Sequence, residues 1–236
     1  MPLTRIIGDI HGKFYDYEVE CLKMGFRHNK ENVPTHSVQV GDFGVGFASN
    51  YWHNELNKWM YDNPTHKFIR GNHDSPQKCK EMHGYILDGS VDGNVMYVGG
   101  AWSIDHAFRT EGVDWWADEE LSVEELNKIY DRYVLYKPKI LITHDCPTTV
   151  AYDMFIANGK SLTGTYQIKT RTGEALQAMF DAYQPKFWFF GHWHHTRQAT
   201  INGTRFVCLG ELDYVDVDFN HMDLTHQLLD IKFNQG

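Results

Sequence analysis

The sequence has few cysteines, and their spacing fits neither a zinc finger nor a disulfide framework. The four are Cys21, Cys79, Cys146 and Cys208, and none belongs to a CxxC pair. We therefore expect free thiols, as in a reducing cytosol. Long apolar runs are also lacking, since no stretch approaches the roughly 20 residues of a membrane helix. The N-terminal residues contain no secretory hydrophobic region. These absences predict a soluble, cytoplasmic protein without a membrane segment.

Positive charge is scarce, with 22 Lys and Arg against 31 Asp and Glu and a net charge of −9. An acidic surface repels long phosphate backbones, so we expect no extended nucleic-acid groove, and a nuclease role is disfavoured. A small phosphorylated substrate stays compatible, because bound divalent cations would invert the local field. The 236 residues, 42% of them hydrophobic, suffice for a single domain over 1–236. Nothing in the pattern indicates an oligomeric state.

Short apolar runs alternate with amphipathic segments, which is typical of a compact α/β unit. We expect strands at 4–7, 37–40, 67–70, 95–98, 139–142 and 187–190, and helices at 14–24, 76–84, 122–133 and 174–183. A further helix is expected to start from a cap at Ser49 or Asn50 and to end at Asn63-Pro64. Ser122 and Glu125 form a capping-box pattern at the start of one helix. Asn202-Gly203, between strand-like segments at 200–201 and 205–209, predicts a hairpin with a two-residue turn. A further strand is expected around 228–231.

Polar side chains of metal-binding type follow five of the expected strands. They are Asp9 and His11, then Asp42, then Asn72 and His73, then His144, then His192 and His194. One such strand end would be ordinary loop sequence, but five in a row are hard to dismiss. Because open α/β sheets build their sites at the carboxyl ends of strands, we expect these side chains to meet in one crevice.

The chemistry of this set points to transition-metal ions. Histidine nitrogens with carboxylate and amide oxygens, and no thiolates, suit Mn, Fe, Zn, Co or Ni and argue against a structural zinc site. Leaving His73 aside, seven candidate ligands exceed what one ion needs, and they suit two ions about 3.5–4 Å apart. Asp42 stands alone at its strand end and is central in order, so we expect it to bridge the ions.

Five sequence blocks carry a family resemblance. They are Asp9-Ile10-His11-Gly12, Gly41-Asp42, Gly71-Asn72-His73-Asp74, Thr143-His144 and Gly191-His192-Trp193-His194. Together, in this order, they resemble the calcineurin-like metallophosphoesterase superfamily. The stretch 99–105, with Arg109 and Trp115-Trp116, resembles a bacterial-type subgroup whose substrates are mostly unassigned. The resemblance implies a four-layer α/β/β/α sandwich with two central mixed β-sheets and a dinuclear metal site at the carboxyl ends of the strands.

The resemblance also implies two ligand sets that share Asp42. One is Asp9, His11, Asp42 and His194, and the other is Asp42, Asn72, His144 and His192. We expect manganese first, with Fe, Zn, Ni, Co or Mg as alternatives. His73 is expected to contact the phosphate or to act as general acid, while a metal-bridging hydroxide attacks phosphorus. Asn72 is also a candidate substrate contact. The implied activity is hydrolysis of phosphate mono- or diesters, with a nucleotide among the candidate substrates.

The second block departs from the family's protein phosphatase branch. That branch continues as Gly-Asp-x-x-Asp-Arg-Gly, whereas this chain reads Gly41-Asp42-Phe43-Gly44-Val45-Gly46. The acid that would orient the catalytic histidine and the phosphate-binding arginine are both absent, which disfavours a Ser/Thr protein phosphatase. Asp105 is our candidate partner for His73, and Arg109 our candidate substitute phosphate clamp.

Two further alternatives stay open at this point. Asp74 either supports the ligand residues or caps the helix that follows Ser75-Pro76. A rival of another class is a metal-stabilised scaffold that binds a partner without catalysis. The intact set of candidate ligands argues against that rival.

Overall fold

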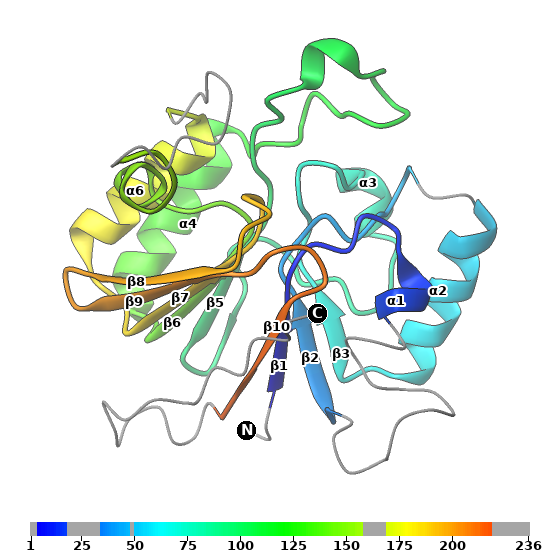
Figure 1. Cartoon of the computed structure of the whole chain (residues 1–236), viewed down its shortest axis with the longest axis horizontal. Helices are drawn as coiled ribbons and strands as arrows, with labels where there is room; N and C mark the ends of the chain where they lie inside the picture. Colours follow the sequence, from blue (N-terminus) through cyan, green and yellow to red (C-terminus); the bar gives the residue numbers. More distant parts are fainter. Residues whose placement is uncertain (1–3, 18–33, 48–49, 158–168, 219–236) are drawn as a thin grey trace.

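Two mixed β-sheets form the centre of the molecule in a computed structural model that describes residues 4–17, 34–47, 50–157 and 169–218 (Figure 1). The smaller sheet has the order β10 (Tyr214–Val217), β1 (Thr4–Ile7), β2 (His36–Gln39), β3 (His66–Phe68). The larger has the order β4 (Val91–Asp92), β5 (Val95–Val98), β6 (Ile140–Thr143), β7 (Phe187–Phe190), β9 (Thr204–Cys208), β8 (Arg197–Ile201). In each sheet the inner strands are parallel, and β10, β4 and β8 run antiparallel to their neighbours.

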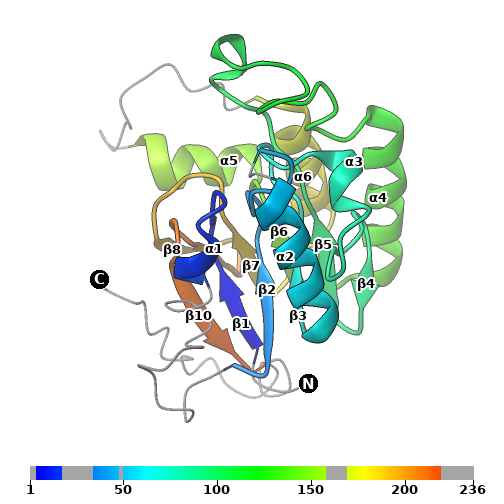
Figure 2. The ribbon, with the colours of Figure 1, turned by 90° about the vertical axis from the view of Figure 1, so that its right-hand side faces the viewer.

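Helices cover the outer face of each sheet. Beside the smaller sheet lie α1 (Phe14–Asp16), α2 (Asn50–Asp62) and α3 (Pro76–Cys79). Figure 2 shows α1 and α2 in front of β1, β2 and β3. Beside the larger sheet lie α4 (Val123–Tyr136), α5 (Thr148–Ala151) and α6 (Arg171–Ala182), and a π-helical turn at Tyr152–Ile156 follows α5.

Three buried apolar clusters separate the resulting layers. One, with Ile6 and Phe189, fills the space between the two sheets. The second packs α4 and α6 against the larger sheet around Trp188. The third packs α1, α2 and α3 against the smaller sheet around Phe68. Three cores between four layers confirm the predicted α/β/β/α sandwich.

Local signals set several element boundaries. The capping box at the start of α4 is confirmed, because Ser122 Oγ accepts from Glu125 N and Glu125 Oε2 accepts from Ser122 N. The helix runs three residues further than expected. The predicted hairpin is confirmed as β8 and β9. Asn202 (φ 48°) and Gly203 (φ 82°) occupy the left-handed conformation that a two-residue type I′ turn requires.

Other boundaries differ from expectation. α6 begins at Arg171 rather than Glu174, because Thr170 Oγ accepts from Gly173 N and caps it earlier. The helix expected at 76–84 ends at Cys79, because the chain turns back and Gly84 O accepts from Phe68 N at the edge of β3.

Among the strands, β3 ends at Phe68, two residues early, and β10 was not predicted. The strand expected near 228–231, and the helix expected at 14–24 beyond Tyr17, fall outside the described residues.

The parallel strands direct their carboxyl ends to one edge of each sheet. The segments after β1, β2, β3, β5, β6 and β7 therefore approach one another where the two sheets meet. All the predicted site residues lie on these segments.

Candidate metal centre

Four of the candidate ligands have a left-handed backbone, with φ of 51° at His11, 56° at Asp42, 65° at His192 and 51° at His194. Such conformations are uncommon for non-glycine residues and persist where surrounding contacts enforce them. One such contact is the hydrogen bond of 2.8 Å from His11 N to Asp42 O. Another is the approach of Gly71, where an added Cβ would lie 2.0 Å from Asp42 Oδ1. The tips of β1, β2 and β3 are thus packed tightly together.

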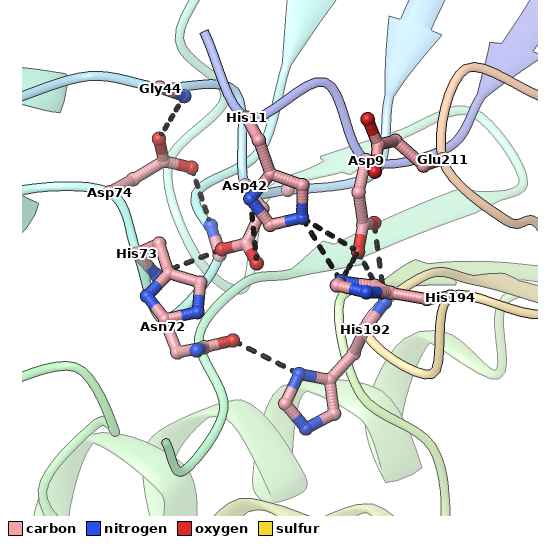
Figure 3. A network of polar contacts seen from close by, with 12 residues as sticks. Asp9, His11, Asp42, Gly44, Asn72, His73, Asp74, His192, His194 and Glu211 are labelled. Carbon is pink, nitrogen blue, oxygen red and sulfur yellow. Dashed lines mark hydrogen bonds and ion pairs between the residues drawn. The ribbon is translucent and has the colours of Figure 1, made fainter. Parts of the chain in front are cut away.

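The first predicted ligand set converges on one point (Figure 3). One ligand atom from each of Asp9, His11, Asp42 and His194 lies within 4.8 Å of the others. His194 Nε2 is 3.2 Å from Asp9 Oδ2 and 3.0 Å from His11 Nε2. His11 Nδ1 lies 3.9 Å from Asp42 Oδ2. The structure therefore brings together residues that follow β1, β2 and β7 and are far apart in the sequence.

The second predicted set gathers on the other side of Asp42. Asn72 Oδ1 lies 2.9 Å from His144 Nε2 and 3.0 Å from His192 Nδ1. His144 Nε2 is 3.5 Å from Asp42 Oδ1. Asp42 therefore directs one carboxylate oxygen toward each group of ligand atoms.

The donors and charges of this site suit a bound cation. Asp9 and Asp42 are fully buried, and among the described residues only histidines lie within ion-pair distance of them. Burial alone would raise the pKa of Asp42, but nearby histidines, His144 foremost, hold it well below its ordinary range. Burial alone would lower the pKa of His144, but the Asp42 carboxylate raises it to about 10. Two buried carboxylates thus require adjacent positive charge, which divalent ions would supply.

The orientation of His144 fits the same conclusion. Its Nδ1 lies 2.8 Å from the carbonyl oxygen of Val40. The Nδ1 proton donates to that carbonyl, and Nε2, which faces the oxygens of Asp42 and Asn72, is the nitrogen that a metal ion would bind in place of its second proton.

Asp74 holds two of the ligand-bearing loops together. The carboxylate is fully buried and accepts four backbone hydrogen bonds of 2.7–2.9 Å from the N–H groups of Phe43, Gly44, Val45 and Gly71. Burial, together with the nearby Asp42, raises its pKa. The cap of α3 is Ser75, whose Oγ accepts from Lys78 N. The helix-cap alternative for Asp74 is therefore wrong.

His73 lies between Asp42 and Arg109. Its backbone N–H donates to Asp42 Oδ1 at 2.8 Å, and its Nε2 is 3.4 Å from Arg109 Nη2. Its buried Nδ1 has no hydrogen-bond partner among the described residues. Asp105 binds Arg109 at 2.7 Å, which lowers the pKa of Asp105 and raises that of Arg109. Among the described residues, Arg109 makes the hydrogen-bonded link between Asp105 and His73, and the Asp105 carboxylate also interacts with His73 electrostatically.

A cavity of about 320 Å³ opens beside these groups. Trp102, Ile104, Arg109 and Trp193 line it together with His73 and several candidate ligands. Its walls thus combine apolar surface with a positive charge next to the buried carboxylates.

Comparison with known proteins agrees with this geometry. A family model described as calcineurin-like phosphoesterase matches residues 4–196. The chain belongs to the calcineurin-like phosphoesterase family. Family membership and the ligand cluster together support a metal-dependent phosphoester hydrolase. Among the described residues, no helix of this phosphoesterase combines the length and apolar character needed to cross a membrane.

Two solved structures are similar to this chain at low identity. A candidate 5′-nucleotidase from Staphylococcus aureus, solved in complex with alpha-ketoglutarate, is 10% identical with a TM-score of 0.51. That match covers 92% of this chain and 50% of the other, so the phosphoesterase spans about half the length of that protein. Phosphopantetheinyl hydrolase from Mycobacterium tuberculosis is 14% identical with a TM-score of 0.45, covering 89% and 90% of the two chains. No curated protein matches the sequence.

Asp145 is a buried site residue that sequence reasoning missed. Its Oδ1 accepts from Cys146 N at 2.8 Å and from Trp193 Nε1 at 3.1 Å, which fixes one wall of the cavity. The Trp193 ring also stacks on Phe155, with centroids 4.6 Å apart. Its sequence signal is its position directly after His144, which makes it the second polar residue beyond the end of a strand.

Proposed function

We propose that this phosphoesterase hydrolyses a small phosphorylated substrate, a mono- or diester, with two divalent ions of which manganese is the first candidate. The observation that carries the proposal is the position of Asp42. Its two oxygens face two separate groups of nitrogen and oxygen ligands, as a carboxylate shared by two ions would. We assign Asp9, His11 and His194 to one ion and Asn72, His144 and His192 to the other, with Asp42 common to both.

The protein's own residues would position the phosphate and supply a proton. Bound divalent ions would neutralise phosphoryl oxygens and lower the pKa of the attacking water. The hydrogen bond from His73 N to Asp42 holds the imidazole at the cavity, where it can contact the phosphate or protonate the leaving oxygen. Arg109, held by Asp105, would bind a phosphate oxygen next to that imidazole.

The size and lining of the cavity support a small substrate. A volume of about 320 Å³ is at the lower end of ligand pockets. The Trp102 and Trp193 rings offer apolar faces to a base or another aromatic group. A nucleotide or a cyclic phosphodiester fits these features.

A paired assay on the purified protein with Mn²⁺ or Ni²⁺ tests the proposal. Bis-p-nitrophenyl phosphate and p-nitrophenyl phosphate are compared for the wild type, Asp42→Asn and His73→Ala. The control is His83→Ala, an exposed histidine outside the cavity lining. Diester turnover lost in both site variants supports a phosphodiesterase, and monoester turnover alone supports a phosphatase. Failure of the wild type to bind any metal overturns the proposal.

A further inference from the structure

Asn72 has two chemically different ends, and only one can bind a cation. Its Oδ1 faces His144 and His192, while its Nδ2 points away and donates to Ser103 Oγ at 3.0 Å. A rotation of the amide by half a turn would direct the NH₂ group toward the ions, and an amide nitrogen with two hydrogens is no ligand. The direction of the amide therefore decides whether Asn72 can bind a cation.

Ser103 alone cannot fix that direction, because a hydroxyl donates and accepts equally well. Glu119 removes the ambiguity. Its Oε1 accepts from Ser103 N at 2.8 Å, and its Oε2 accepts from Ser103 Oγ at 2.5 Å. A carboxylate has no proton to give, so the hydroxyl must donate to Glu119 and accept from Asn72 Nδ2.

We propose that Glu119, acting through Ser103, is a positioning residue that holds the Asn72 amide with its oxygen toward the ions. The inference rests on the proposed function only in taking Asn72 as a ligand. Glu119, Ser103 and Asn72 are 3%, 1% and 1% exposed, so water does not readily replace any of these three hydrogen-bonded residues. Burial raises the pKa of Glu119, and the two hydrogen bonds from Ser103 oppose that rise.

The backbone of Glu119 is itself held in place. Its carbonyl oxygen accepts from Arg70 Nη1 at 2.6 Å, and Arg70 O accepts from Gly100 N at 2.9 Å. A Cβ on Gly100, which has φ of 80°, would lie 2.5 Å from Glu119 O. The Glu119 carboxylate is thus held next to Ser103 by a rigid backbone that is fixed to Arg70, two residues after β3.

Glu119→Gln tests the inference because it should reverse the direction of the hydrogen bonds that link Glu119, Ser103 and Asn72. The fixed Ser103 N–H must still face the new amide oxygen, so the new NH₂ group donates to Ser103 Oγ. The hydroxyl then has only Asn72 as acceptor, and the Asn72 amide turns its nitrogen toward the ions. We expect one of the two ions to bind roughly 10–100-fold more weakly.

The measurement is a calorimetric Mn²⁺ titration with metal content by mass spectrometry, on the full chain. The matched control is Glu120→Gln, a buried neighbour whose Oε1 accepts from Thr172 N, and it should bind two ions as the wild type does. Circular dichroism checks folding. If Glu119→Gln does not fold, Ser103→Ala is titrated instead, with several-fold weaker binding of one ion expected.

A double variant separates positioning from a merely structural role. In the Asn72→Asp background both ends of the side chain are oxygens, so the direction no longer matters. In Asn72→Asp alone, the Ser103 hydroxyl can donate to only one of the two carboxylates. When Glu119→Gln is added, the glutamine NH₂ donates to Ser103 Oγ and the hydroxyl donates to the aspartate, so every group has a partner again. The double variant should therefore bind the affected ion more tightly than Glu119→Gln alone.

Wild-type affinity for both ions in Glu119→Gln, or in Ser103→Ala where that variant is used, would overturn the inference. The inference would also be overturned if Glu119→Gln lowered Mn²⁺ affinity equally in the wild-type and Asn72→Asp backgrounds. A wild type that binds no metal would instead overturn the proposed function, so the two failures are distinguishable.

Discussion

Replacing Asp74 with asparagine should destabilise the protein strongly, although the substitution changes little in shape. Asp74 Oδ1 accepts from Gly44 and Val45, and Oδ2 accepts from Phe43 and Gly71. Asparagine can keep only one of these pairs, because its NH₂ group would face two other N–H donors.

The magnitude follows from the two donors that lose their acceptor. A buried unsatisfied N–H group costs about 1–3 kcal/mol, so two cost about 2–6 kcal/mol. Asp74 also repels Asp42 and is fully buried, which raises its pKa, and a neutral amide relieves that repulsion. We therefore expect the lower part of the range, about 2–4 kcal/mol. That is a large share of the 5–15 kcal/mol typical of a folded domain.

Equilibrium unfolding in urea measures this loss, with and without Mn²⁺. Asp181→Asn, on the exposed side of α6, is the matched control and should stay within about 0.5 kcal/mol of the wild type. Mn²⁺ affinity should fall as well, because the loops that Asp74 joins carry Asp42 and Asn72. A loss below about 1 kcal/mol with unchanged Mn²⁺ affinity would refute the reasoning, since other contacts would then hold the loops.

Three other outcomes are expected. His66 is buried, which lowers its pKa to about 4, so as pH falls the unfolded chain binds a proton at this histidine before the folded protein does. The free energy of unfolding should therefore fall by at most about 3 kcal/mol between pH 6.5 and pH 4. Urea unfolding at both pH values should show a smaller fall in His66→Asn, and an equal fall would contradict this. Arg109→Ala should lower kcat/KM roughly 10–100-fold, whereas Arg205→Ala, outside the cavity, should not; unchanged kcat and KM would rule Arg109 out as a clamp. Relative to protein with Mn²⁺ at about 100 times its Kd, chelation of the metal should lower Tm by roughly 5–10 °C, and re-adding Mn²⁺ should restore it. An unaltered Tm would count against bound metal.

The strand ends could be predicted because their signals are local. The candidate ligands directly follow five apolar runs, so the order of residues alone placed Asp42 and His144 near one another. The strand β10 escaped prediction because Tyr214–Val217 alternates weakly and finds its place through a distant pair, in which Arg5 binds Asp216 at 2.7 Å.

Residues that support the site were harder to find, because their partners lie far along the chain. Nothing around Glu119 indicates that it binds Ser103. Asp74 sits beside Ser75-Pro76, a local cap signal, yet its partners are the loops after β2 and β3. Long-range hydrogen bonds of this kind leave no periodic pattern in a sequence.

The bonds between Ser103 and Glu119 also bear on how this enzyme could acquire new substrates. The intervening segment, which carries Asp105 and Arg109 to the cavity, leaves and rejoins the domain at nearly the same point. Closing a longer loop costs little, about 0.6 kcal/mol for each doubling in length. We therefore expect insertions and deletions between these two residues to leave Asn72 in place. The segment would then be an exchangeable module, and grafting 104–118 from one family member to another would test whether it sets selectivity.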